Sequence, residues 1–235
     1  MRCKIAELLV EVPPVGNMPQ RCTEYLHSAD APPQITIPGD SFHPSAWPNL
    51  SEEDVIYLET GLHFYYSLMD FDGLMLHASA VEMDGRAYLF SGPCGTGKST
   101  HTRIWQKTFG EAAQVFNDDK PALRLMDGKW FAYGTPWCGK DGINQNKKIP
   151  VAGICFLKQA PKNVIRRLTP QEAITHLFAQ TLYQFRTAQE LDKMLCVAEK
   201  LVRQIPVFEF ENRPEPEAAR MSFDTMRRVA QEELG

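Results

Sequence analysis

The sequence predicts an α/β fold: a mixed, hairpin-rich central sheet with a phosphate-binding loop (P-loop) and flanking helices. One observation is a strand–loop–helix pattern from Arg86 to about Phe109, whose loop 92–99 reads Gly-Pro-Cys-Gly-Thr-Gly-Lys-Ser. The other is that strand-like runs joined by short turns outnumber helices before residue 160. Strict strand–helix alternation, which is typical of parallel sheets, is therefore missing. We expect the loop to follow a strand of a central hairpin.

The N-terminal extension, residues 1–70, is proline-rich and irregular over its first 50 residues. Short extended segments are expected at Lys4–Val12 and Gln34–Pro38. Ser51 is a good helix N-cap because three acidic residues follow it, and the apolar residues after them recur at helical spacing. We predict a helix over Ser51–Met69 that packs on the sheet.

Residues 71–235 are predicted to form the P-loop domain, which begins with two hairpins. The first joins Leu74–Glu82 to Arg86–Ser91 across Asp84-Gly85, and the second joins Gln114–Leu125 to Trp130–Tyr133 across Asp127-Gly128. Asp-Gly between strand-like runs is a strong signal for a two-residue turn. The elements expected after them are a central strand Val151–Leu157, a helical region Pro170–Gln204, a strand Pro206–Glu211 and a terminal helix Glu215–Glu233.

Composition excludes several classes of protein. The chain has 235 residues, a net charge of −4 and a pI of about 5.9, which argues against non-specific nucleic-acid binding. No apolar run is long enough to span a bilayer, and Glu7 stands where a signal peptide needs its apolar segment. We expect a cytoplasmic protein with no nucleic-acid or membrane partner, and a homo-oligomer stays open. The six scattered cysteines are expected to be free thiols, with Cys155 in the core.

The loop fits the pattern G-x-x-x-x-G-K-[ST] between a strand and a helix, the context in which that pattern binds nucleoside triphosphates. Its backbone N–H groups and the helix N-terminus favour phosphate oxygens. Lys98 is expected to reach the β- and γ-phosphates, and the Ser99 hydroxyl to bind Mg²⁺. We assign the nucleotide to Gly92, Pro93, Cys94, Gly95, Thr96, Gly97, Lys98, Ser99 and Thr100.

Asp118 and Asp119 supply the second half of the site, since phosphoryl transfer needs a carboxylate near Mg²⁺ and a group that positions the acceptor. Adjacent strand residues point to opposite faces unless the strand ends or kinks, so the two carboxylates can take different roles. An Asn-Asp-Asp turn in solvent is the alternative. His77 is either a structural residue or a partner of an aspartate or the γ-phosphate. Lys140 is either a surface lysine or a cation that neutralises the transferred phosphate.

The ordered set of Leu76-His77-Ala78-Ser79-Ala80, Asp84-Gly85, the P-loop and Asn117-Asp118-Asp119 resembles the catalytic domain of HPr kinase/phosphorylase. That domain is related in fold to ATP-dependent phosphoenolpyruvate carboxykinase. The resemblance covers roughly residues 73–160. It implies ATP and Mg²⁺ as cofactors, with Lys98 on the phosphates and Ser99 on the metal. It further implies that Asp118 is the general base with His77 beside it, and that Asp119 assists the metal.

The first 70 residues do not look like the usual N-terminal domain of HPr kinase, and Tyr133–Lys140 replaces the stretch that follows its aspartates. The HPr protein is therefore not expected as the substrate. We expect an ATP-dependent phosphotransferase, a kinase, that acts on a serine-type hydroxyl of a peptide, protein or small metabolite. A carboxykinase-like enzyme and an ATP-binding regulatory module with little turnover are the alternatives. The acceptor and the nucleobase stay open, and His101, Arg103, Trp105 and His176 are assigned no role.

Overall fold

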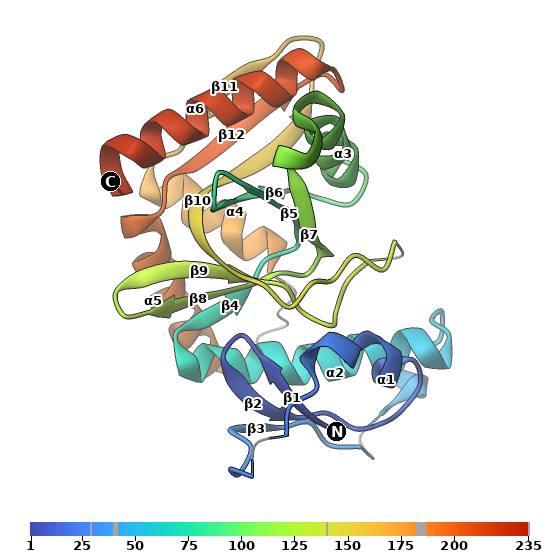
Figure 1. The fold of residues 1–235 in the computed structure, drawn as a ribbon. Helices are drawn as coiled ribbons and strands as arrows, with labels where there is room; N and C mark the ends of the chain where they lie inside the picture. The colour runs from blue at the N-terminus through green and yellow to red at the C-terminus, as the bar shows by residue number, and fades with distance from the viewer. Residues whose placement is uncertain (29, 40–41, 140, 182–186, 235) are drawn as a thin grey trace.

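The computed structural model describes residues 1–28, 30–39, 42–139, 141–181 and 187–234. Within these ranges, nine strands form a curled mixed sheet at the centre of an α/β fold (Figure 1). The path runs β4-β8-β9-β10-β6-β5-β7, and β12 pairs with β10 while β11 pairs with β12. The strands are β4 (Gly73–Met75), β5 (Ala78–Met83), β6 (Arg86–Ser91), β7 (Gln114–Asp119), β8 (Ala122–Met126), β9 (Lys129–Tyr133), β10 (Lys148–Gln159), β11 (Val164–Arg167) and β12 (Val207–Asn212).

Helices cover both faces of the sheet. α3 (Lys98–Phe109) packs beside α6 (Pro216–Leu234), and α4 (Pro170–Gln180) packs beside α5 (Ala188–Gln204). The alternation of β6 shows both layers: Leu89 belongs to the core shared with α4 and α5, whereas Tyr88 belongs to the core shared with α3 and α6. β6 is thus buried on both faces, which fixes the position of the loop that follows it.

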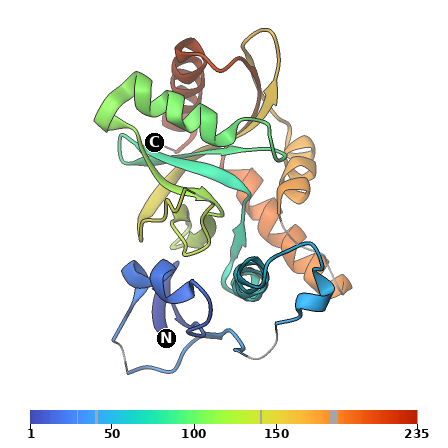
Figure 2. The same cartoon turned by 90° about the vertical axis from the view of Figure 1, so that its right-hand side faces the viewer.

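The N-terminal region forms a small sheet of β1 (Arg2–Ile5), β2 (Leu8–Glu11) and β3 (Ile35–Thr36). The short helix α1 (Met18–Arg21) and the long helix α2 (Glu52–Leu68) accompany it. Figure 2 looks along α2, which lies beside this small sheet. Four 3-10 helices complete the elements of the described ranges: η1 (Thr23–Tyr25), η2 (Pro44–Ala46), η3 (Met69–Phe71) and η4 (Gly110–Ala112).

Aromatic packing attaches α2 to the segment that follows β9. The indole of Trp137, which is fully buried, stacks on Phe64 of α2 with ring centroids 4.8 Å apart. It also donates a hydrogen bond of 3.1 Å to Thr60 Oγ1. Residues on both sides of position 70 therefore share one hydrophobic core. The division of the chain at that position stays a prediction.

Several predicted elements are confirmed. β5 and β6 form the antiparallel hairpin across Asp84-Gly85, and β8 and β9 form the one across Asp127-Gly128. The helix that begins after Ser51 has its predicted cap, because Ser51 Oγ accepts a hydrogen bond from the Asp54 N–H at 3.2 Å. The central strand, the late strand and the terminal helix correspond to β10, β12 and α6, and Cys155 is fully buried.

Three predictions about element boundaries were wrong. The run Gln114–Leu125 is two strands, since Pro121 cannot donate to a ladder; β7 pairs with β5 while β8 pairs with β9. Leu74–Glu82 is also two strands, β4 and β5, which belong to different parts of the sheet. The helical region Pro170–Gln204 is two helices, because α4 ends at Gln180 and α5 begins at Ala188. Within the described residues, no helix is both long and apolar enough to cross a bilayer.

Candidate functional site

The backbone of the predicted P-loop leaves N–H groups uncapped at the start of α3. Gly97, in the left-handed region at φ 95°, is the N-cap of α3, and no side chain caps the first turn. The free N–H groups of that turn therefore stay available to an anion. Gly92 allows the loop to close tightly, since a Cβ there would lie 2.9 Å from Thr96 Oγ1 and 3.1 Å from the Leu157 carbonyl oxygen. The helix begins at Lys98, as predicted.

Lys98 turns back over the loop. Its Nζ donates hydrogen bonds of 2.8 Å to the Gly92 carbonyl and 3.2 Å to the Pro93 carbonyl. Burial lowers the pKa of Lys98, and the carboxylates of Asp119 and Asp118 oppose that shift. The ammonium is thus held at the mouth of the loop, close to both predicted carboxylates.

Asp118 faces the P-loop helix. Its Oδ1 accepts a hydrogen bond of 3.2 Å from Ser99 Oγ, and the residue is 8% exposed. The backbone N–H of Asp118 donates to the Ile143 carbonyl at 3.2 Å, which holds the end of β7 in place. A hydroxyl and a carboxylate oxygen, both hard ligands of the kind Mg²⁺ prefers, therefore meet beside the loop.

Asp119 points elsewhere because the strand kinks at its last residue, where Asp119 has φ 104°. Its Oδ1 lies 3.2 Å from Nε2 of His77, which sits in the gap between β4 and β5. The His77 N–H donates to the Gln180 carbonyl at 2.9 Å, and the His77 carbonyl accepts from Ser91 Oγ at 2.8 Å. These two bonds fix the backbone of His77 between α4 and the end of β6, and its imidazole contacts Asp119, whereas the resemblance implied a place beside Asp118.

A buried lysine completes the surroundings of Asp119. Lys120 Nζ lies 2.9 Å from Asp119 Oδ2 and 2.7 Å from Tyr57 Oη, and it sits 4.2 Å from the centroid of the Tyr57 ring. The Arg21 guanidinium lies 4.8 Å from the same ring centroid and donates to the Cys138 carbonyl at 3.0 Å. Residues of α1 and α2 thus extend the site from the N-terminal region.

These contacts set the charge state of Asp119. Burial alone would raise its pKa, but the hydrogen bond with His77 and the nearby Lys120 ammonium outweigh burial and hold the pKa well below its usual range. Burial lowers the pKa of Lys120, and the Asp119 carboxylate opposes that shift. Burial, followed by the charge of Asp119, raises the pKa of Tyr57. Asp119 therefore stays ionised at neutral pH.

Two clefts flank the loop. The one we call the α3 cleft has a volume of about 530 Å³, and its wall includes Thr96, Gly97, Thr100, His101, Asn212 and Pro214. The one we call the α4 cleft has a volume of about 460 Å³, and its wall includes Pro93, Cys94, His176, Gln180 and Glu209. Gln159 borders both, and its Nε2 donates to the Gly95 carbonyl at 2.9 Å.

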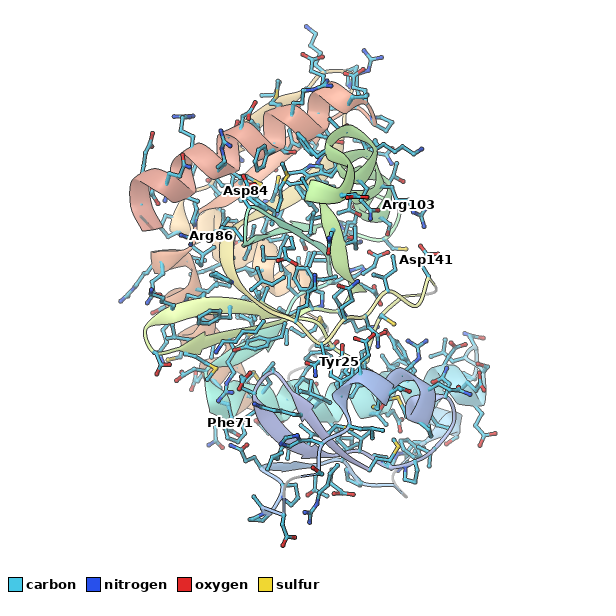
Figure 3. All side chains as sticks on the ribbon, viewed as in Figure 1. Tyr25, Phe71, Asp84, Arg86, Arg103 and Asp141 are labelled. Atoms are coloured by element: carbon cyan, nitrogen blue, oxygen red, sulfur yellow. The ribbon has the colours of Figure 1, made fainter. Side chains whose placement is uncertain are left out.

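The structure thus brings together most residues that the sequence singled out: the P-loop, both aspartates and His77. Lys140 lies outside the described residues. Arg103 of α3 forms an exposed ion pair with Asp141, and the labelled pair lies at the edge of the molecule in Figure 3. Within the described ranges, no cluster of three or more histidine, cysteine, aspartate or glutamate side chains is arranged to hold a metal by itself.

Sequence reasoning missed Tyr57 and Lys120. Lys120 directly follows Asp118 and Asp119 in the sequence, so its position could have indicated that it lies at the site. Tyr57 carried none, because it lies 62 residues before Asp119 on a helix whose sequence indicated only packing. Asn212 and Gln159 were missed because only the parallel pairing of β12 with β10 brings them to the loop.

Comparisons with known proteins match a family model and a number of solved structures. The family model described as "SynChlorMet cassette protein ScmC" matches residues 49–212, more than two thirds of the chain. Among solved structures, the Hpr(Ser) kinase/phosphatase from Coxiella burnetii is similar at 12% identity and a TM-score of 0.38. That match covers 68% of this chain and 92% of the other. No curated protein matches.

Proposed function

This chain belongs to the ScmC family, and we propose that it is a Mg·ATP-dependent kinase that transfers the γ-phosphoryl group to an alcohol hydroxyl. The observation that carries the proposal is that two adjacent aspartates beside the predicted P-loop contact different partners. Asp118 contacts the Ser99 hydroxyl at 3.2 Å, and Asp119 contacts His77 at 3.2 Å on the other side of the kink. A module that only binds a nucleotide has no need for the second of these arrangements.

In this proposal the P-loop N–H groups and Lys98 hold the phosphates of ATP. Ser99 and Asp118 are the residues that would hold Mg²⁺, since both offer oxygen ligands at one place. The metal would neutralise charge on the β- and γ-phosphate oxygens. The nearby charge of Lys98 adds to that neutralisation.

In this proposal Asp119 contacts the hydroxyl that receives the phosphoryl group. Its carboxylate, held ionised by His77 and Lys120, accepts a hydrogen bond from the attacking hydroxyl. It receives the hydroxyl proton as the new oxygen–phosphorus bond forms and the bond from the γ-phosphorus to the β,γ-bridging oxygen breaks, which releases ADP. A carboxylate with a low pKa is a weak base, so its main effect is to orient the hydroxyl for in-line attack. That suits phosphoryl transfer, which depends more on positioning and charge stabilisation than on proton abstraction. These contacts favour the reverse of the roles that the resemblance implied for the two aspartates.

Two substitutions that keep size and remove charge test the proposal. Asp119→Asn should leave Mg·ATP affinity within about twofold of wild type while transfer of the γ-phosphoryl group, to water or to an acceptor, falls about 10²-fold or more. Asp118→Asn should instead raise the Mg²⁺ concentration needed for half-maximal binding of ATP. Calorimetric titration and release of label from γ-labelled ATP measure the two effects.

Asp141→Asn is the matched control, because Asp141 is an exposed carboxylate paired with Arg103 on the same helix as Ser99. It should behave as wild type in both assays. Wild-type turnover and wild-type Mg²⁺ dependence in both the Asp118 and Asp119 variants would reject the kinase. The acceptor itself is sought by incubating wild type and the Asp119 variant with γ-labelled ATP and a cell extract separated into protein and small-molecule fractions.

A further inference from the structure

We propose that the α3 cleft binds the nucleoside of the ATP, and that Asn212 makes the site select adenine over guanine. The inference rests on the proposed function, because it extends the same site from the phosphates to the base. It concerns residues at the end of β12 that neither the P-loop pattern nor the aspartate pair involves.

The aspartates lie on one side of the loop and the α3 cleft on another, which indicates how the ATP is oriented. Asp118 and Asp119 mark the side where the γ-phosphate reacts. The α3 cleft borders neither aspartate; its wall begins at Thr96 and Gly97 and continues to Thr100 in the first turn of α3. A phosphate chain that starts at the aspartates and follows the N–H groups of the loop and first turn ends at this cleft. Its volume, about 530 Å³, lies in the range of small-molecule pockets.

His101 adds an independent observation. The side chain lines the cleft and is 2% exposed, and its Nδ1 has no hydrogen-bond partner within the described residues. Its Nε2 is already used by Trp105 Nε1 at 3.2 Å and Ser222 Oγ at 3.1 Å. Burial lowers the pKa of His101 to about 3, so the imidazole is neutral. Because the Trp105 N–H can only donate, Nε2 is the acceptor nitrogen and Nδ1 carries the ring proton. A buried N–H without an acceptor is unfavourable, and a ribose hydroxyl oxygen can accept from it.

Asn212 gives the cleft its chemical preference. The residue is 8% exposed, and its Nδ2 donates to the Phe210 carbonyl at 3.2 Å and the Lys158 carbonyl at 3.4 Å. These two bonds fix the orientation of the amide, and its Oδ1 accepts no hydrogen bond from the described part of the chain. The position therefore presents an acceptor oxygen to a ligand.

An acceptor at this place distinguishes the two purines. Adenine carries an amino group at C6, which donates to Oδ1, whereas guanine carries a carbonyl oxygen there, which does not. Pro214 borders the same cleft with an apolar ring that can lie against the face of a base. We expect wild type to bind Mg·ATP about tenfold more tightly than Mg·GTP, because the C6 carbonyl oxygen of guanine would face Asn212 Oδ1, and both are hydrogen-bond acceptors.

The test compares three ligands by calorimetry: Mg·ATP, Mg·GTP and inorganic triphosphate, which has no nucleoside. Asn212→Leu should weaken ATP binding about tenfold and remove the preference over GTP, with triphosphate binding unchanged. His176→Gln, in the α4 cleft, is the matched control and should bind all three as wild type does. Unchanged ATP and GTP affinities in the Asn212 variant, or a loss of ATP affinity in the His176 variant, would overturn the inference.

A second measurement needs no variant, in case Asn212→Leu fails to fold. Irradiation of wild type with 8-azido-ATP should label peptides that contain residues 159–160 or 212–214. Label confined to residues 176–180 would place the base in the α4 cleft and reject the assignment. If wild type binds neither ATP nor triphosphate, the proposed kinase function fails as well; if it binds both but without any effect of Asn212, the nucleoside site alone is rejected.

Discussion

Replacing Lys120 by methionine tests whether the site depends on a buried charge. The side chain is 9% exposed, and its ammonium contacts Asp119 Oδ2 at 2.9 Å and Tyr57 Oη at 2.7 Å. Methionine fills much of the same volume but lacks the charge and the hydrogen bonds. The substitution therefore leaves the Asp119 carboxylate with His77 as its remaining basic partner.

The expected cost follows from the burial of the pair. Removing one partner of a fully buried ion pair destabilises a protein by about 3–5 kcal/mol, because the other charge is left uncompensated. The Asp119 side chain is 28% exposed and keeps its contact with His77, so water and imidazole offset part of that cost. We expect the free energy of unfolding of Lys120→Met to fall by about 2 kcal/mol at pH 7.

The sign of the pH dependence is also fixed. Because the pKa of Asp119 is depressed in the folded protein, its interactions stabilise the fold above the ordinary aspartate pKa of about 4, and this stability is lost as pH falls through the folded-state pKa. In Lys120→Met the folded-state pKa of Asp119 rises towards the ordinary value. The difference in unfolding free energy between wild type and variant should thus be largest above about pH 5 and should shrink below about pH 4.

Urea denaturation between pH 3 and pH 8, followed by tryptophan fluorescence, measures this difference. Lys158→Met is the control, because Lys158 forms an exposed ion pair with Glu211 and should show no measurable change. Equal stabilities of wild type and Lys120→Met throughout this pH range would refute the reasoning. A destabilisation that does not diminish at low pH would assign the effect to packing and leave the carboxylate out of it.

Two further predictions concern the loop and the attachment of α2. Cys94 and Cys196 are both exposed, whereas Cys3 is fully buried. Saturating Mg·ATP should therefore slow the alkylation of Cys94 and leave that of Cys196 unchanged, as measured by mass-spectrometric footprinting. Equal labelling of Cys94 with and without nucleotide would contradict a P-loop site. Trp137→Ala should lower the free energy of unfolding by about 3–5 kcal/mol, because it removes a fully buried indole that stacks on Phe64, and an urea midpoint equal to that of wild type would contradict this account.

The parts of the fold that could be predicted are those with local signals. The hairpin of β5 and β6 was predicted from Asp84-Gly85, and α3 from the glycine-rich loop before it. Strand ends were less accessible to local reasoning. The break at His77 arises because β4 and β5 pair with different strands, which no short window of sequence encodes. At Pro121 a local signal existed, since proline interrupts a ladder, but the apolar residues around it read as one continuous strand.

The candidate site was predictable to the same extent. The P-loop and the aspartates were found because each motif is contiguous, and His77 because it stands in a strand-like run near the loop. The direction of each aspartate could not be inferred from alternation alone. It depends on the kink at Asp119, whose positive φ places its carboxylate against His77 while Asp118 faces Ser99.

The sequence analysis placed no site residue in the N-terminal region, but the structure places Tyr57 and Arg21 beside the site. Their contacts give a physical reason for this arrangement. The Lys120 side chain, which is 9% exposed, needs compensation for its lost hydration, and the carboxylate of Asp119, whose side chain is 28% exposed, supplies only part of it. Tyr57 supplies the rest through its hydroxyl and the face of its ring, and Arg21 packs over the same ring. Helix α2 therefore does more than cover the sheet: it stabilises the cation that keeps Asp119 ionised. The first 70 residues are in this respect part of the candidate site.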